Sequence, residues 1–189
     1  KISTPTSNKS PDYTFSSSKA GAIIYSGSCS STETSAVSGN NTITLVSLSD
    51  GTYGDCSIVV RDFDGNLSNS LIISSFEIDT ISPVVSELTF VTTPSNDSTP
   101  EYTFSSDEAG TITYGGSCSS STTSAVSGNN TITLVSLSDG TYSDCAITVT
   151  DTAGNVSNAL TITSFEVDST EVDSIQMGGS MQGVGLSLS

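Results

Sequence analysis

The sequence predicts an all-β protein made of two tandem antiparallel β-sandwiches with a C-terminal strand-like extension. The first observation behind this is a repeat, because the twenty residues from Thr34 to Tyr53 occur again, unchanged, from Thr123 to Tyr142. The second is composition: Ser, Thr and Gly dominate, and apolar residues alternate with polar ones, which is typical of strands. The third is the recurrence of Asn, Asp and Gly, the residues of tight turns, between the alternating segments.

The repeat extends well beyond the identical run. Pairs of identical residues keep the same spacing of 89 positions, as in Pro11/Pro100, Tyr13/Tyr102, Cys29/Cys118, Cys56/Cys145, Asn66/Asn155 and Phe76/Phe165. A unit of this length is too long for a solenoid repeat and suits an independent small domain. We therefore predict one domain at 1–79, a second at 80–168, and an extension at 169–189.

The strands of the second repeat follow from the alternation and from the turns between them. The predicted ranges are 86–92, 101–105, 110–115, 131–136, 141–150 and 158–167, with a short extra strand near 122–127, and the first repeat has their counterparts. Six or seven short strands at this spacing predict an antiparallel sandwich. Apolar residues two positions apart should face the core, namely Ile132 and Leu134, Ile147 and Val149, and Leu160 and Ile162.

The four cysteines form one pair per repeat. Cys29 and Cys56 are 27 residues apart, and so are Cys118 and Cys145. A zinc site would need closely spaced thiols or added histidines, and the chain has no His. The simplest prediction is one disulfide within each domain, which places the protein outside the reducing cytosol.

Charge excludes several classes of function. The net charge is −16, and Lys1, Lys9, Lys19 and Arg61 are the only basic side chains. Nucleic acids and anionic membranes bind clustered Lys and Arg, so neither is an expected partner, and no apolar run is long enough for membrane insertion. Without an imidazole base, and with few cations to stabilise a developing anion, we do not expect an enzyme.

Two motifs carry a family resemblance. L-x-D-G-T-Y is followed by D-x-x-G-N-x-S in both repeats, at 48–53 and 62–68, and again at 137–142 and 151–157. Together with the linker segment from Phe76 to Pro83, they resemble the bacterial Ig-like repeats of large surface adhesins. Tyr53 and Tyr142 resemble the tyrosine corner of Ig sandwiches, whose hydroxyl bonds to the backbone across a turn. Here the cysteine lies three residues later, so the disulfide should tether the segment after the third strand to the sixth strand.

The resemblance also implies a calcium question, since related adhesin arrays are stiffened by Ca²⁺ held between domains. The matching acidic positions are Asp62, Asp64, Glu77, Asp79, Asp151, Glu166 and Asp168. Carboxylates and backbone carbonyls supply the oxygen ligands that Ca²⁺ prefers. The alternative is that Asp caps its own turn and that the other carboxylates are solvated charges at strand ends. No cofactor is required by either interpretation.

The two ends of the chain differ from the repeat pattern in complementary ways. Lys1 aligns with Phe90, so the first repeat lacks a counterpart of 84–89, most of its opening strand. After Asp168 the chain continues into an alternating apolar segment. Its apolar residues are Ile175, Met177, Met181, Val184, Leu186 and Leu188. This pattern predicts a donor strand. The alternatives are that the segment is a flexible linker, which its Gly and Ser content suits, or that the ends are cuts from a longer array.

We therefore predict a structural extracellular protein whose subunits polymerise head-to-tail into a surface filament by donor-strand complementation. The main alternative is a rod or stalk segment of a large multi-repeat cell-surface adhesin. A carbohydrate-binding module is less favoured, because sugar stacking needs an aromatic platform and the chain has no Trp. The expected partners are identical subunits, and a surface receptor or glycan remains open.

Overall fold

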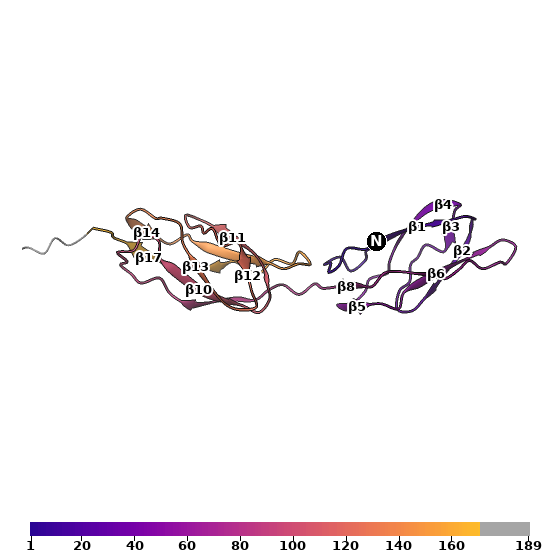
Figure 1. Ribbon diagram of the computed structural model, residues 1–189, viewed down its shortest axis with the longest axis horizontal. Helices are drawn as coiled ribbons and strands as arrows, with labels where there is room; N and C mark the ends of the chain where they lie inside the picture. Colours follow the sequence, from indigo (N-terminus) through magenta and orange to yellow (C-terminus); the bar gives the residue numbers. More distant parts are fainter. Residues whose placement is uncertain (171–189) are drawn as a thin grey trace, which may run out of the picture.

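The computed structural model describes residues 1–170 and shows two β-sandwich units joined by an extended linker (Figure 1). All of the regular elements among these residues are strands, and every strand pair is antiparallel. Each unit has its own hydrophobic core. The predicted fold class, tandem antiparallel sandwiches of the Ig type, is confirmed. The predicted extension lies mostly outside the described residues.

The first unit contains eight strands among the described residues. They are β1 (Asp12–Ser17), β2 (Gly21–Ser26), β3 (Ser35–Ala36), β4 (Gly39–Thr44), β5 (Gly51–Tyr53), β6 (Ser57–Asp62), β7 (Leu71–Ile72) and β8 (Phe76–Ile78). One sheet has the order β3-β2-β6-β7, and the pairs β1-β4 and β5-β8 form the other layer. The alternation in β6 explains its place in the core, because Ile58 and Val60 point inward while Arg61 is exposed.

The second unit repeats this topology with one strand more. Its strands are β9 (Val85–Thr89), β10 (Glu101–Ser106), β11 (Gly110–Gly115), β12 (Ser124–Ala125), β13 (Gly128–Thr133), β14 (Gly140–Tyr142), β15 (Ala146–Thr150), β16 (Leu160–Thr161) and β17 (Phe165–Val167). The sheets are β12-β11-β15-β16, β13-β10-β9 and β14-β17. The additional strand is β9, which pairs with the edge of β10 that β13 leaves free.

Two predicted strands are wrong in extent, because the chain changes sheet within each of them. The predicted strand at 141–150 is β14 and β15, and the one at 158–167 is β16 and β17. β14 pairs with β17, whereas β15 pairs with β16 in the other sheet. Buried residues continue through both breaks, at Cys145 and Ile162, so the alternation gives no signal of the crossing. The strand predicted at 131–136 lies earlier, at β13, and the one at 86–92 ends earlier, at Thr89.

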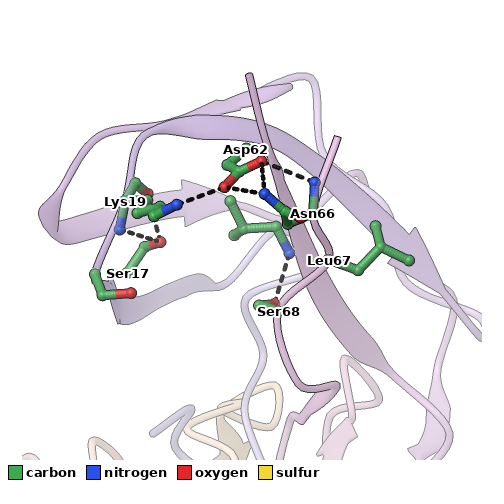
Figure 2. Close-up of a pocket in the computed structure, with 8 residues that line it drawn as sticks. Ser17, Lys19, Asp62, Asn66, Leu67 and Ser68 are labelled. Atoms are coloured by element: carbon green, nitrogen blue, oxygen red, sulfur yellow. Dashed lines mark hydrogen bonds and ion pairs between the residues drawn. The ribbon is translucent and has the colours of Figure 1, made fainter. Parts of the chain in front are cut away.

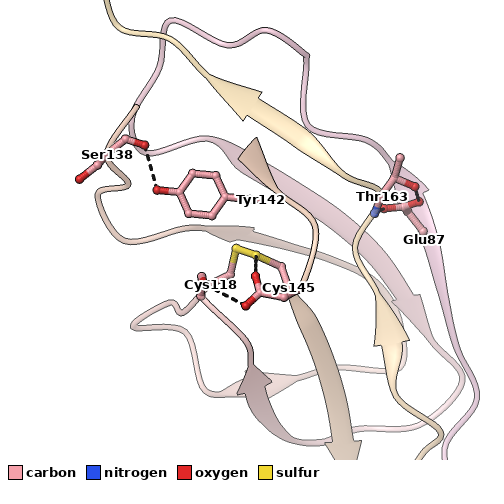
Figure 3. The surroundings of a disulfide bond; sticks show 8 residues. Glu87, Cys118, Ser138, Tyr142, Cys145 and Thr163 are labelled. Atoms are coloured by element: carbon pink, nitrogen blue, oxygen red, sulfur yellow. Dashed lines mark hydrogen bonds between the residues drawn. A yellow bond between two sulfur atoms is a disulfide. The ribbon is translucent and has the colours of Figure 1, made fainter. Parts of the chain in front are cut away.

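The hydrophobic cores and the disulfides agree with the sequence-based predictions. Ile132, Leu134, Ile147, Val149 and Ile162 are buried, and Leu160 packs against them partly buried. Both disulfides form as predicted, Cys29 to Cys56 and Cys118 to Cys145. The tyrosine corner is also present, since the Tyr142 hydroxyl donates to the Ser138 carbonyl at 2.8 Å and the Tyr53 hydroxyl to the Ser49 carbonyl at 2.9 Å (Figure 3).

Candidate functional site

The two units meet at a surface that we call the domain joint. It consists of Ser7, Asp79, Glu108 and the turn 151–155. The Asn155 side-chain amide donates to the Asp79 carbonyl at 2.9 Å, and the Ser7 amide donates to the Ala153 carbonyl at 3.2 Å. The turn is held by Asp151, whose carboxylate accepts from the backbone and side chain of Asn155 at 2.9 and 2.8 Å. The D-x-x-G-N motif thus builds the receiving surface of a joint.

Three carboxylates converge at this joint. Oxygens of Asp79, Glu108 and Asp151 all lie within 4.8 Å of one another, and all three side chains are half-buried. Burial raises the pKa of Glu108, and the neighbouring charges of Asp79, Asp151 and Asp107 raise it further. The joint therefore holds three like charges with no basic residue of the second repeat to offset them.

The structure brings together two of the seven predicted calcium residues. Asp79 and Asp151 meet in the cluster, while Glu108, which the sequence motifs did not single out, completes it. Glu108 belongs to the loop between β10 and β11, and no motif spacing links that loop to the linker. The remaining predicted residues are not grouped with them in the described part of the chain, and these are Asp62, Asp64, Glu77, Glu166 and Asp168. Ca²⁺ needs six to eight oxygens, so calcium binding stays a prediction.

The charge repulsion at the joint gives a pH prediction. A carboxyl whose folded pKa lies above its ordinary value of 4.5 destabilises the folded state at pH 7, and this cost disappears as pH falls through the raised pKa toward 4.5. Glu108→Gln should therefore raise Tm at pH 7 in EGTA-containing buffer, with a gain that shrinks on acidification. Glu101→Gln, exposed on β10, is the matched control. A gain independent of pH would contradict this account.

The same variants test the calcium prediction. If the ion occupies the joint, adding Ca²⁺ in place of EGTA should raise the Tm of the wild type and of Glu101→Gln more than that of Glu108→Gln. A wild-type Tm that is identical in Ca²⁺ and in EGTA would rule the ion out.

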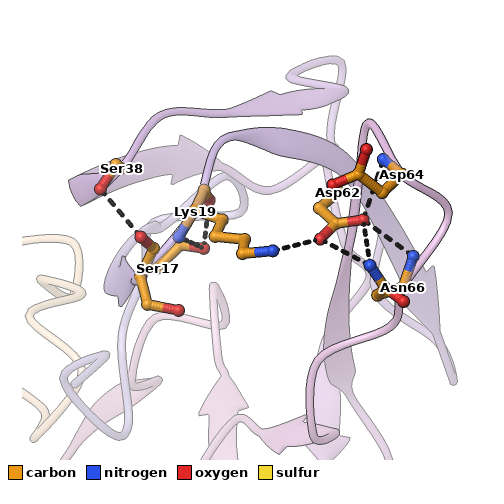
Figure 4. Close-up of polar contacts among 7 residues, drawn as sticks. Ser17, Lys19, Ser38, Asp62, Asp64 and Asn66 are labelled. Carbon is orange, nitrogen blue, oxygen red and sulfur yellow. Dashed lines mark hydrogen bonds and ion pairs between the residues drawn. The ribbon is translucent and has the colours of Figure 1, made fainter.

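The first repeat carries an equivalent turn, drawn in Figure 4, at its outer end, away from the second unit (Figure 1). Asp62 accepts from the Asn66 amide at 2.8 Å, as Asp151 does from Asn155. In place of Glu108 this repeat has Lys19, whose ammonium lies 2.7 Å from the Asp62 carboxylate. The hydrogen bond from Lys19, followed by those from Asn66, lowers the pKa of Asp62 well below its ordinary value.

A groove runs along the first unit beside β1. We call it the edge groove, and its lining residues are Phe15, Ser16, Ser17, Ser18, Ile58, Val60, Leu67, Ser68, Asn69 and Leu71. Its volume is about 380 Å³, and a second pocket of about 200 Å³ continues it toward Lys19 and Asp62 (Figure 2). In the second unit β9 lies along the corresponding edge of β10, and Val85 packs against the core there.

The residues next to β9 are more buried than their counterparts in the first unit. Tyr102 is fully buried in the second unit, whereas its counterpart Tyr13 is only partly buried. Burial and the adjacent Glu87 carboxylate raise the pKa of Tyr102. Glu87 also accepts from the Thr163 amide at 2.9 Å and from its hydroxyl at 2.5 Å (Figure 3). Among residues 1–170, Ser74, the counterpart of Thr163, has no such acceptor.

The fold and the disulfides define a class of protein: two tandem Ig-type sandwiches, each with one internal disulfide. Residues 92–169 match the family model described as bacterial Ig-like domain, which confirms the resemblance inferred from the sequence motifs. Residues 1–170 contain no helix that is long and apolar enough to span a membrane.

Several solved structures match this chain at low sequence identity. The fibronectin(III)-like modules of Clostridium thermocellum CbhA share 12% identity over 88% of this chain and 93% of theirs, with a TM-score of 0.45. The D00-D0 domain of intimin shares 13% identity over 85% of this chain and 95% of its own, with a TM-score of 0.33. The comparison with curated proteins gave no match.

Proposed function

We propose that this chain is a structural, extracellular subunit that polymerises head-to-tail into a surface filament by donor-strand complementation. In this mechanism an extended segment of one subunit adds a strand to an open sheet edge of the next. Head-to-tail transfer does not close on itself, so the product is an open fibre. The identical subunit is then the main partner. A surface receptor or glycan remains a further prediction, as does the absence of nucleic-acid and membrane partners.

The observation that carries the proposal is the difference between the two sheet edges. Within residues 1–170, β1 pairs with β4 alone, whereas β10 pairs with both β13 and β9. An open edge exposes unpaired backbone groups and invites a strand from another chain. The edge groove beside β1 is lined by Phe15, Val60 and Leu71, and Leu71 is 39% exposed. An added apolar strand would bury this surface.

The proposed donor is the C-terminal segment, which lies outside the described residues. Its sequence alternates apolar with small or polar residues, as a strand with one buried face requires. The apolar residues are Ile175, Met177, Met181, Val184, Leu186 and Leu188.

A second candidate function rests on the domain joint. In a rod segment of a larger adhesin, a preceding, covalently attached repeat would contact the turn 62–66 of the first unit. The first unit contacts the turn 151–155 of the second unit in the same way. The linker segment from Phe76 to Pro83, which joins the two repeats, favours this alternative. It differs from the filament proposal in one measurable way, because isolated chains would then stay monomeric.

Deletion of 172–189 is the test. The full chain should appear as continuous fibres in electron micrographs, and the deletion variant as separate two-domain particles. Replacing Val184, Leu186 and Leu188 by Ser keeps the chain length and serves as the matched variant, and it should also fail to polymerise. Fibres that persist after both changes would refute the proposal, and a monomeric full chain would favour the rod segment.

A further inference from the structure

The two surfaces that meet at the domain joint each occur a second time in the chain. These second copies lie at opposite ends of the molecule (Figure 1). The outgoing half is the end of each unit, where β8 or β17 leads into the linker. The receiving half is the D-x-x-G-N turn at the base of the following unit. The first unit has a receiving turn, and the second unit has an outgoing end, and neither half has a partner within residues 1–170.

The outgoing ends have the same hydrogen bonds. The Asp79 amide donates to the Thr6 carbonyl at 3.0 Å, and the Asp168 amide donates to the Ser95 carbonyl at 2.8 Å. Each aspartate then caps a turn, since Asp79 accepts from the Ile81 amide and Asp168 from the Thr170 amide, both at 3.1 Å. The backbone amide of the residue after each aspartate donates to a carboxylate 30 positions earlier. Thr80 donates to Asp50, and Ser169 donates to Asp139. Asp168 is thus presented as Asp79 is.

The receiving turns also agree. The Asp62 amide donates to the Asn66 carbonyl at 2.9 Å, and the Asp151 amide donates to the Asn155 carbonyl at 3.0 Å. Ser17 and Ser106 each donate at 2.6 Å to the carbonyl of the residue two positions on, Lys19 or Glu108. Lys19 and Glu108 therefore occupy the same position on the same local backbone. The two receiving turns differ in the charge at this position, and also in Phe63 and Asp64, where the second repeat has Thr152 and Ala153.

From this correspondence we infer that the outgoing end of one subunit docks on the receiving turn of the next, with Asp168 facing Lys19 and the Asn66 amide donating to the Asp168 carbonyl. This inference rests on the proposed head-to-tail filament. In the proposed contact between subunits, Lys19 forms an ion pair with Asp168. At the joint inside the chain, the corresponding residues Glu108 and Asp79 are both acidic.

Charge complementarity identifies a second copy as the occupant. Lys19 lies 2.7 Å from Asp62 and its side chain is still 63% exposed, so its ammonium has donors left for a second carboxylate. In a chain of net charge −16, subunits repel one another, and a cation at the point of contact offsets that repulsion locally. The same turn exposes Phe63 to 90%, where the second repeat has Thr152, which adds apolar area to this end surface.

The test is the charge of Lys19 in the full chain. Lys19→Glu places at this position the residue that the second repeat already tolerates, so the variant should fold. We expect the critical concentration for polymerisation, measured by pelleting, to rise about fivefold to tenfold, because an attraction becomes a repulsion. Lys9→Glu, with the same change in net charge on an exposed residue away from the turn, should polymerise like the wild type.

Asp168→Asn completes a double-mutant cycle, because Asn keeps the turn-capping oxygen and removes the charge. In the Asp168→Asn background, Lys19→Glu should change the critical concentration about twofold or less. Equal behaviour of Lys19→Glu and Lys9→Glu, or an undiminished effect of Lys19→Glu in the Asp168→Asn background, would overturn the inference. If the deletion of 172–189 still abolishes fibres in that case, the filament proposal stands without it. A wild type that never polymerises removes both.

Discussion

Replacing Cys118 and Cys145 together by Ala should lower the free energy of unfolding of the second unit by roughly 3 to 3.5 kcal/mol. The disulfide closes a loop with a sequence separation of 27, and in the chain-entropy model a loop of about this size restricts the unfolded chain by that amount. Both sulfurs are buried against the core, so the change also removes packing. For a domain this small, the loss is a large share of the total stability.

The measurement is guanidinium unfolding of the chain lacking 172–189, with the equivalent Cys29 and Cys56 variant as the matched comparison. Each double variant should destabilise its own unit and leave the other transition in place, because the two cores are separate. Addition of a reductant to the wild type should reproduce both effects. A loss below about 1 kcal/mol would contradict the role assigned to these staples.

Tyr102→Ala should cost the second unit about 3 to 5 kcal/mol, in the range for truncation of a large buried aromatic side chain. Tyr102 is fully buried, stacks near Phe104 with ring centroids 6.3 Å apart, and lies beneath the strand that carries Glu87. The equivalent change at Tyr13 should cost the first unit less in the tail-deleted monomer, because Tyr13 is only partly buried there. Calorimetry of the two variants measures the difference.

The comparison becomes informative on assembly. If a donor strand covers the edge of β1, Tyr13→Ala should become as costly in the filament as Tyr102→Ala is in the monomer. Equal costs for the two tyrosines in the monomer would mean that the open edge leaves the first core complete, and the proposed role of the edge groove would fail.

The sequence predicted most of the fold because the determinants are local. Alternation placed Ile132, Leu134 and Val149 in the core, and the paired cysteines and corner tyrosines needed only their spacing along the chain. The sheet crossings at Cys145 and Ile162 could not be predicted in this way, since a buried residue at a crossing looks like one more buried residue of a strand. The short strand predicted near 122–127 is confirmed as β12, whereas the short extents of β12 and β16 depend on the pairing in the folded chain.

The joint was only partly predictable. The D-x-x-G-N motif and the linker indicated Asp79 and Asp151 as candidate ligands. Glu108 lies on a loop that comes close to them only when the two units pack together. One signal was available in the sequence, namely that Lys19 and Glu108 occupy equivalent positions with opposite charge. Opposite charge at one position of otherwise matching repeats indicates that the two positions face different surroundings.

Hydrogen exchange of β1 tests the central claim most directly. The claim is that assembly adds a strand to the free edge of β1, so that its backbone amides gain partners like those that β9 gives β10. We predict that exchange across Asp12–Ser17 slows on polymerisation to the level of Glu101–Ser106, and that it stays fast in the chain lacking 172–189. Exchange in β1 that is equally fast in fibres and in monomers would contradict the account.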